Sequence, residues 1–413
     1  DNHDNRNQKE QKLDQAESAP RPGVEERWVL EPGSSSIHGS VARIQGPEDN
    51  AFSRGLYHCP VKCRNFLLGV VAALCLMAAT SGPASAAAPQ PVVQGNRIID
   101  SVTGQAFVPR GVNFPSFEYA CQQGWGYSNL GDDAPSSMAT AAETAAAMAG
   151  WKINTVRIPL NQDCWLGTRD APVSDEIDER TVADYREAVL SFVDALNHEG
   201  LVVVLDLHSR KRIGSDSAGS LAMPDPESLA FWSSVAGAYR DHPSVMFDAF
   251  HAPSSRTDAA GNLVFDLTWP CWRDGGCQAP VDDDQTPTNG RVTYPAQGMA
   301  RVVQVIRQAG ARQPVLLAGI DGGNDLTHWW ELAPQDDQVV ASFHVADDSA
   351  CASEACWGAS LLPLSGSVPV ICGDVRTTRP GSGYLRDYLA WADAHGVGSL
   401  FWVWSDHASD PTS

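Results

Sequence analysis

Short apolar runs alternate with longer amphipathic segments along the chain after Pro89. The apolar runs are rich in Val, Ile, Leu and Phe, which favours buried strands, and the segments between them place apolar residues at helical spacing. Strands that alternate with helices in this way are typical of parallel βαβ units. Eight strands are predicted, at 106–114, 153–160, 201–208, 245–250, 314–320, 339–345, 368–374 and 398–404.

The segments between the strands predict helices, and several of them end in glycine after a polar last turn, which is a signal for helix termination. They lie at 136–150, 181–200, 226–242, 296–310 and 383–396.

Strand–helix repeats of this number over roughly 320 residues predict an α/β fold with a single (β/α)8 barrel. A doubly wound sheet is the alternative, but residues 111–114 are not the glycine-rich phosphate loop that usually follows its first strand. The run at 92–107 predicts a hairpin that covers the barrel floor. Because the chain ends soon after Trp404, we expect the final helix to be missing.

The segment before the barrel has a different pattern. Residues 1–61 are polar and lack apolar periodicity, so we expect a disordered extension or a start assigned to the chain by mistake. Residues 62–86 contain basic residues, an apolar run at 66–80 and an Ala-Ser-Ala cleavage site, in the order of a secretory signal peptide. A membrane anchor is the alternative, but the run is about five residues shorter than the ~20 needed to span a bilayer. The barrel is therefore assigned to 87–413, and the protein is expected to be secreted.

Composition narrows the possible partners. The chain has 413 residues and a formal net charge of −21. Nucleic acids and anionic membranes are bound by basic surfaces, so this balance disfavours both classes of partner. We expect a monomer without a cofactor and, after signal cleavage, without a membrane contact.

The cysteines of the exported part predict disulfide bonds. Two short loops, Cys271–Cys277 and Cys351–Cys356, lie among turn-forming residues. Cys121 and Cys164 could form a third pair, and Cys372 lies in an apolar strand, where a free thiol behaves as a small hydrophobe. Zinc is the alternative to the disulfides, but neither loop has the usual ligand spacing, so we expect no metal.

Polar or aromatic side chains lie at the ends of the predicted strands. In (β/α)8 barrels the carboxyl ends of the strands carry the active site, so these residues predict a pocket at that end. They are Asn113, Arg157, Asp206, His208, His251, His344, Asp374 and Trp404.

Six ordered motifs resemble glycoside hydrolase family 5, the cellulase-like retaining glycosidases. The resemblance runs from about Val92 to Trp404, and the motifs are TVRIPL (155–160), VVLDLHS (203–209), the segment 222–250, SFHV (342–345), PVICGDV (369–375) and FWVWS (401–405). It implies a β-linked polysaccharide, glucan or mannan, as the partner. The substrate-binding residues that it implies are Arg157, His208, His251, His344 and Trp404.

The chain departs from the family pattern where the two catalytic carboxylates belong. The fourth strand of the family leads to Asn-Glu-Pro, and here the residues are His251-Ala252-Pro253, so Ala252 occupies the acid/base position. Asp374 occupies the nucleophile position, where the family has Glu, and Ala346 replaces a Tyr. Loss of the general acid alone typically lowers the rate by about 10²–10⁴-fold. We therefore predict a pseudo-glycosidase; a weak or altered retaining glycanase that uses Asp374 and a non-carbohydrate scaffold remain alternatives.

Other groups could compensate. His251 could protonate a leaving oxygen, but it occupies the position beside the acid, and neighbouring residues of an extended segment point different ways. Asp248 is expected to lie too deep, and nothing in the sequence places Glu118 near the scissile bond. The basic run 210–212 predicts either a solvated charged surface or a pocket that prefers an anionic group. Further aromatic platforms could come from Trp125, Trp165, Trp357 and Trp402.

Overall fold

The computed structural model describes residues 87–123, 140–172, 181–212, 218–258, 260–281, 292–379, 381 and 383–404. The predicted leader and extension at 1–86 lie outside the described residues, as do Trp125 and residues 405–413, where the final helix was expected to be missing. No helix in the described ranges combines the length and the apolar character that a bilayer crossing requires.

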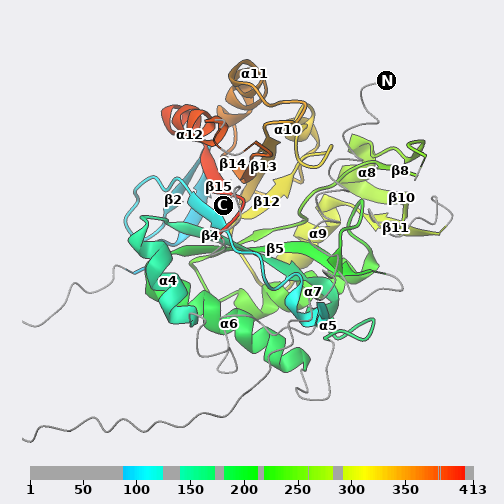
Figure 1. The fold of residues 1–413 in the computed structure, drawn as a ribbon, viewed down its shortest axis with the longest axis horizontal. Coiled ribbons are helices and arrows are strands. Elements are labelled where there is room, and N and C mark those ends of the chain that lie inside the picture. The colour runs from blue at the N-terminus through cyan, green and yellow to red at the C-terminus, as the bar shows by residue number, and fades with distance from the viewer. Residues whose placement is uncertain are drawn as a thin grey trace, which may run out of the picture. The chain divides into compact units, whose positions relative to one another are not determined.

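Eight parallel strands close into a barrel, as predicted. Each strand pairs with its neighbours in parallel register, and the pairing of β4 with β5 closes the ring. The strands in order around the ring are β3 (Arg110–Asn113), β4 (Thr155–Asn161), β5 (Val202–Lys211), β7 (Val245–Asp248), β12 (Val315–Ala318), β13 (Val339–Ala346), β14 (Val370–Arg376) and β15 (Gly398–Phe401). Helices surround this ring (Figure 1).

All five predicted helices are present. They are α4 (Ala141–Gly150), α6 (Val182–His198), α7 (Pro226–Tyr239), α9 (Met299–Gln308) and α12 (Tyr384–His395). The first three begin at capping boxes. In each, the side chain of the N-cap residue accepts a hydrogen bond from the backbone N–H three residues later, and the side chain of that later residue accepts one from the backbone N–H of the N-cap residue. These pairs are Thr140 with Glu143, Thr181 with Asp184, and Asp225 with Ser228.

One long helix was not predicted. Helix α11 (Glu354–Ser365) connects β13 to β14 and contains Gly358 and Pro363, which lower helix propensity. It forms because tertiary packing buries Trp357, Leu361 and Leu364 against the barrel. The short helices α3 (Ala120–Gln123), α5 (Gln162–Leu166) and α10 (Trp329–Leu332) were also not predicted.

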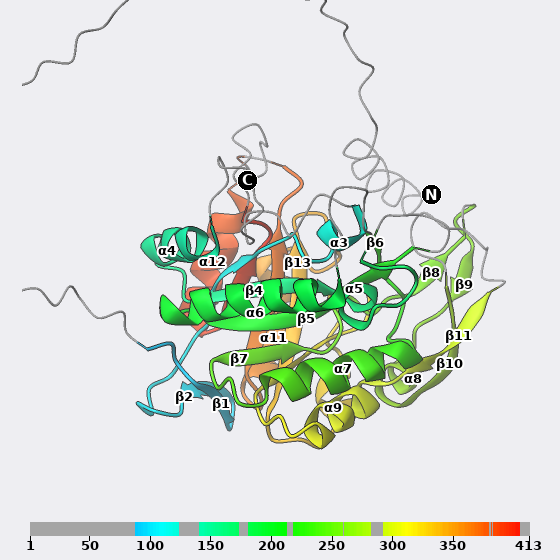
Figure 2. The same ribbon diagram turned by 90° about the horizontal axis from the view of Figure 1, so that it is seen from below.

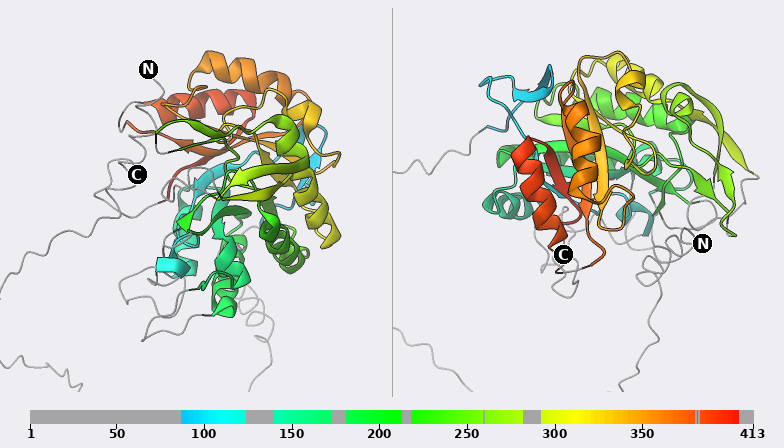
Figure 3. Two further views of the ribbon diagram at one scale, coloured as in Figure 1. Left: turned by 90° about the vertical axis from the view of Figure 1, so that its right-hand side faces the viewer. Right: turned by 90° about the horizontal axis from the view of Figure 1, so that it is seen from above.

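A large insertion separates β7 from α9. It contains β8 (Arg256–Thr257), β9 (Leu263–Phe265), α8 (Trp269–Asp274), β10 (Gly275–Pro280) and β11 (Thr293–Gln297). Figures 1 and 2 show it on the opposite side of the barrel from α4, and Figure 3 shows it from its own side. It extends one edge of the barrel beyond the ring of helices.

The barrel interior is apolar at one end and polar at the other. Successive residues of a strand face opposite sides, so every second residue points inward. Along β5 the inward positions run from Val202 and Val204 to Asp206. Met246 on β7 likewise precedes Asp248, which is two residues closer to the carboxyl end. The polar groups therefore gather at the carboxyl end.

The predicted hairpin covers the apolar end. Strands β1 (Pro91–Gln94) and β2 (Arg97–Asp100) pair in antiparallel register. Ile98 of the hairpin and Phe107, which follows it, pack in one cluster with the inward side chains of the barrel. This arrangement confirms that the hairpin forms the barrel floor.

Three disulfide bonds form as predicted, between Cys121 and Cys164, Cys271 and Cys277, and Cys351 and Cys356. Cys372 is a buried free thiol, and burial raises its pKa. This confirms its expected role as a small hydrophobe.

Candidate functional site

Arg157 occupies the centre of the polar end of the barrel. Its guanidinium contacts Asp248 Oδ2 at 3.0 Å and Asp206 Oδ2 at 2.9 Å, and it donates to Asn113 Oδ1 at 2.9 Å. The side chains of Arg157, Asp206 and Asp248 are all fully buried. A buried charge requires such partners, so this network holds β3, β4, β5 and β7 in register at the site.

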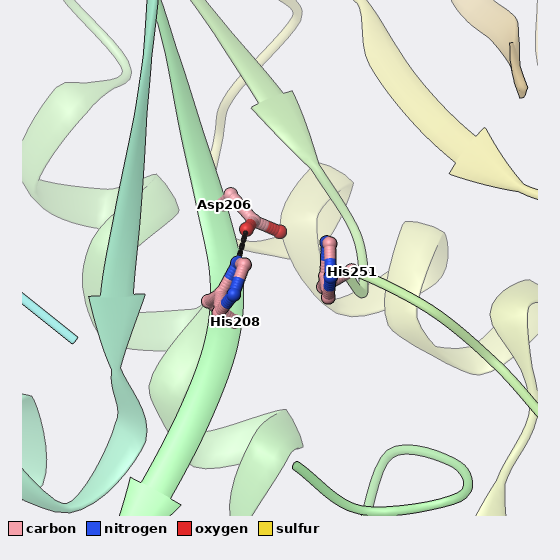
Figure 4. Close-up of side chains that lie close together, drawn as sticks. All are labelled: Asp206, His208 and His251. Atoms are coloured by element: carbon pink, nitrogen blue, oxygen red, sulfur yellow. Dashed lines mark hydrogen bonds and ion pairs between the residues drawn. The ribbon is translucent and has the colours of Figure 1, made fainter. Parts of the chain in front are cut away.

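His208 is fixed by Asp206. Its Nδ1 lies 2.7 Å from Asp206 Oδ2 (Figure 4). The His208 ring stacks on His251 with centroids 3.8 Å apart, and on Trp402 at 5.6 Å. The guanidinium of Arg157 also lies 3.1 Å from His251 Nδ1. The structure therefore brings together three predicted site residues, Arg157, His208 and His251.

The opposite half of the site is formed by His344 and Asp374, on the adjacent strands β13 and β14. The two residues are register partners, and the His344 ring lies 5.1 Å from the His251 ring, between centroids. Three atoms here lack a hydrogen-bond partner of good geometry among the described residues: both ring nitrogens of His344, and Asp374 Oδ1. Gly323, with a φ of +87°, lies directly against this imidazole, where a Cβ would collide with the ring.

The protonation of both inner histidines is perturbed in the same direction. Burial lowers the pKa of His251 well below its usual value, and His208 and Arg157 add to the effect. Burial also lowers the pKa of His344, with Arg157 and Arg376 contributing, although the backbone of Gly322 opposes the shift. A neutral imidazole is a weak proton donor, so His251 is poorly suited to act as a general acid at neutral pH.

Asp248 and Glu118, the two carboxyl groups considered as substitutes for an acid at position 252, are both buried. Ala252 follows β7 directly beyond His251 and is half-buried. Asp248 lies deeper, as predicted, where burial raises its pKa and Arg157 opposes the rise. Glu118 is fully buried and accepts from the Ser116 backbone N–H at 2.8 Å; burial raises its pKa to about 8. It is protonated at neutral pH but has no surface with which to reach a substrate.

The structure separates the two tryptophans that follow the last strand, β15. Trp402 stacks on His208, whereas the Trp404 ring packs edge-on against Trp151, with centroids 5.7 Å apart. The role predicted for Trp404 stays a prediction, and Trp402 is the residue that faces the other site side chains. The spacing of two residues puts both tryptophans on one side of an extended strand, so the sequence pattern alone did not separate them.

Two of the other proposed platforms belong to the core. Trp165 and Trp357 are 2% and 3% exposed and donate to Ser234 Oγ and the Cys351 carbonyl. The prediction that these two tryptophans are sugar platforms is wrong, because a buried indole offers no face to a sugar.

The basic run 210–212 is also not a solvated surface. Arg210 and Arg212 are buried and donate to the backbone carbonyls of Val281 and Ala218. The run therefore anchors the extension of β5 to neighbouring segments. It does not form the exposed charged surface that was considered.

Comparison with known proteins decides the family. A profile described as Cellulase (glycosyl hydrolase family 5) matches residues 111–408. The chain belongs to glycoside hydrolase family 5. A comparison with curated proteins found no match.

Solved family 5 structures share the fold. A β-glucanase from Saccharophagus degradans is 16% identical with a TM-score of 0.54, covering 78% of this chain and 87% of the other. An endocellulase from Pyrococcus horikoshii, in complex with cellotetraose, is 16% identical with a TM-score of 0.54, at 79% and 93% coverage. The catalytic domain of endoglucanase Cel5A from Thermobifida fusca is 14% identical with a TM-score of 0.50, at 77% and 85% coverage. At such identities the likeness establishes the barrel fold.

Proposed function

We propose that this family 5 chain is a secreted, monomeric protein that binds β-1,4-glucan at the polar end of its barrel and hydrolyses it little or not at all. The observation that carries the proposal is the alanine at position 252. A retaining glycosidase requires two carboxyl groups about 5–5.5 Å apart, one as acid and one as nucleophile. The family resemblance assigns the nucleophile position to Asp374 and the acid/base position to Ala252, whose side chain is a methyl group.

Glucan binding is supported by what the site retains. Trp402 and His208 present stacked rings beside the Arg157 network. An indole face of this kind stacks well on the apolar face of a pyranose. The Saccharophagus degradans β-glucanase and the Pyrococcus horikoshii endocellulase were both solved with cellotetraose, which makes a cello-oligosaccharide the first ligand to test.

The test restores the two carboxylates. We expect the unaltered chain to bind cellotetraose in calorimetry and to release no detectable product over hours. The double variant Ala252→Glu/Asp374→Glu should gain hydrolysis by about 10²-fold or more, because general acid catalysis alone contributes about 10²–10⁴-fold. Turnover by the unaltered chain at the rate of the double variant would refute the pseudo-glycosidase.

Single variants separate the two roles. Ala252→Glu alone should help unactivated glucan more than aryl glycosides, because an aryl leaving group needs little protonation. The matched control is Ala252→Gln, because glutamine has nearly the size of glutamate but carries no acidic group. Equal gains in Ala252→Glu and Ala252→Gln would show that the acid is not the missing element. If the unaltered chain neither binds nor cleaves cellotetraose, glucan binding is wrong and a scaffold role is favoured.

A further inference from the structure

Three potential metal ligands meet at the half of the site that lacks hydrogen-bond partners. His251 follows β7, His344 lies on β13 and Asp374 on β14, and one ligand atom of each lies within 4.8 Å of the others. The chain thus brings two imidazoles and a carboxylate together from three strand ends. Only tertiary structure creates this cluster, since the three residues are far apart in sequence.

Two of the three residues, His344 and Asp374, carry buried polar atoms that lack the hydrogen-bond partners that burial usually requires. His344 is 6% exposed and Asp374 is 5% exposed. Both ring nitrogens of His344 and Asp374 Oδ1 lack hydrogen-bond partners of good geometry among the described residues. A buried polar group without a partner costs free energy, so a water molecule or an ion is the expected partner of such atoms.

We propose that His251, His344 and Asp374 bind a divalent first-row transition-metal ion, of which Zn²⁺ is the representative. Imidazole and carboxylate are ligands that such ions accept, and two imidazoles with one carboxylate leave coordination positions open. Ligand atoms lie about 2.0–2.2 Å from zinc, which places them roughly 3.3–3.6 Å apart around a tetrahedral ion. Since 4.8 Å is the upper limit of the present separations, the ligand atoms have to approach one another by at most about 1.5 Å, through rotation of the side chains.

One contact has to change when the ion binds. His251 Nδ1 lies 3.1 Å from the Arg157 guanidinium. Arg157 keeps Asn113, Asp206 and Asp248 as acceptors, so it can release the imidazole. Rotation of the His251 ring about its Cβ–Cγ bond then turns a nitrogen toward His344 and Asp374.

A second group of possible ligands is less suitable. Asp206, His208 and His251 also lie within 4.8 Å of one another (Figure 4). However, Asp206 Oδ2 already contacts both Arg157 and His208, at 2.9 Å and 2.7 Å. Asp206 Oδ1 has no hydrogen-bond partner among the described residues, but the carboxylate is already shared by Arg157 and His208, so an ion there would compete with a buried ion pair. The group containing His344 involves no ion pair in the described part of the chain.

The two departures from the family pattern fit the proposal. The family carries Asn at the position of His251 and Glu at that of Asp374. The histidine adds a nitrogen ligand beside the position where Ala252 has removed a carboxylate. This inference goes beyond glucan binding and does not rest on it.

The test is a metal titration of the full chain after chelator treatment and dialysis. Calorimetry with Zn²⁺ should show one saturable site per chain, and Co²⁺ should give an absorption spectrum with imidazole ligands rather than that of the aqueous ion. His251→Asn and Asp374→Asn should each weaken Zn²⁺ binding by about 100-fold or more. Mutation of the residues that hydrogen-bond to metal ligands typically lowers metal affinity by about 10–100-fold, and loss of a ligand itself should lower the affinity at least as much.

Two controls separate this site from surface binding. His328→Asn removes a histidine 3.0 Å from Glu331 on the surface and should leave the affinity unchanged. The triple variant His58→Ala/Cys59→Ser/Cys63→Ser removes other potential zinc ligands and should also bind as the unaltered chain does. Circular dichroism and the melting temperature of each metal-free variant report whether it folds.

Two outcomes would overturn the proposal. The first is no saturable binding of one ion per chain, with an aqueous-type Co²⁺ spectrum, which would leave water as the partner of these atoms. The second is full affinity in folded His251→Asn and Asp374→Asn. If both variants unfold, the comparison of the unaltered chain with His344→Gln decides: equal Zn²⁺ affinity and the same Co²⁺ spectrum in that folded variant would overturn the proposal.

Discussion

The two halves of the site differ in how their polar groups are satisfied. On the side of β4, β5 and β7, Arg157 joins Asp206 and Asp248 in a fully buried network, and His208 contacts Asp206. On the side of β13 and β14, His344 and Asp374 Oδ1 have no such partners among the described residues. The first half is held by buried ion pairs, although Asp206 Oδ1 and Asp248 Oδ1 also lack hydrogen-bond partners there. In the second half, His344 and Asp374 form no ion pair in the described part of the chain, and this half has the properties of a place where a ligand binds.

The largest expected effect comes from breaking the complete half. Arg157→Met should lower the free energy of unfolding by about 3–5 kcal/mol, because it leaves Asp206 and Asp248 buried without their counter-charge. Urea denaturation monitored by circular dichroism measures this change.

The matched change in the other half is Asp374→Asn, which should alter the free energy of unfolding by less than about 1 kcal/mol, because Asp374 has no ion pair to lose. Equal losses in the two variants would show that the halves do not differ in stability. That result would remove the basis of the comparison.

Glu118, which is buried in the fold, is expected to lower the free energy of unfolding as pH rises. Burial raises its pKa to about 8 from a usual value near 4.5, so the folded state binds an extra proton between these values. Its contribution to stability is therefore fully present below about pH 4.5 and is lost as pH rises through about 8. Glu118→Gln should remove this loss, which is on the order of 3–5 kcal/mol for a shift of this size.

The measurement is the free energy of unfolding at pH 5 and pH 9 for both proteins. The unaltered chain should lose stability over this interval relative to Glu118→Gln. A parallel pH dependence in the two proteins would mean that Glu118 is not buried as a neutral acid.

The two tryptophans sharpen the comparison for ligand binding. Trp402→Ala should weaken cellotetraose binding by about 10–100-fold, or roughly 1.5–3 kcal/mol. The reason is that it removes the indole beside His208 on which a sugar ring is proposed to stack. Trp404→Ala should have a smaller effect, since its ring packs against Trp151. Calorimetry on both variants distinguishes them, and a larger loss in Trp404→Ala would restore the original prediction for that residue.

A modest loss of stability is expected at the edge of the second half. Asp347 follows β13, and although burial alone would raise its pKa, bonds from Thr378, Arg379 and Thr377 lower it to about 2. Its contribution is present above the unfolded value near 3.8 and is lost as pH falls toward 2. Asp347→Asn should cost about 1–2 kcal/mol at pH 7 and much less at pH 2.

Thermal melting at these two pH values checks this expectation. An Asp347→Asn variant that is as stable as the unaltered chain at pH 7 would show that this loop contributes little. The comparison would then rest on the strand ends alone.

Much of the fold could be predicted because its signals are local. The alternation of apolar runs with capped helices is set by backbone geometry and burial, and short Cys-to-Cys spacings predicted two of the three disulfides. Helix α11 was missed because Gly358 and Pro363 weaken its local pattern, and only packing against the barrel stabilises it.

The sequence by itself determined the barrel, the polar residues at its strand ends and the alanine at position 252. Tertiary structure decided which of these groups are partners. Trp402 and Trp404 share strand parity, yet β15 ends at Phe401, and the Trp404 ring turns to Trp151. Likewise, nothing local shows that His251 meets Arg157 of β4 and His208 of β5, or that His344 has no hydrogen-bond partner of good geometry among the described residues. The physical reason is that a hydrogen bond depends on distances between strands, and those are fixed only when the barrel closes.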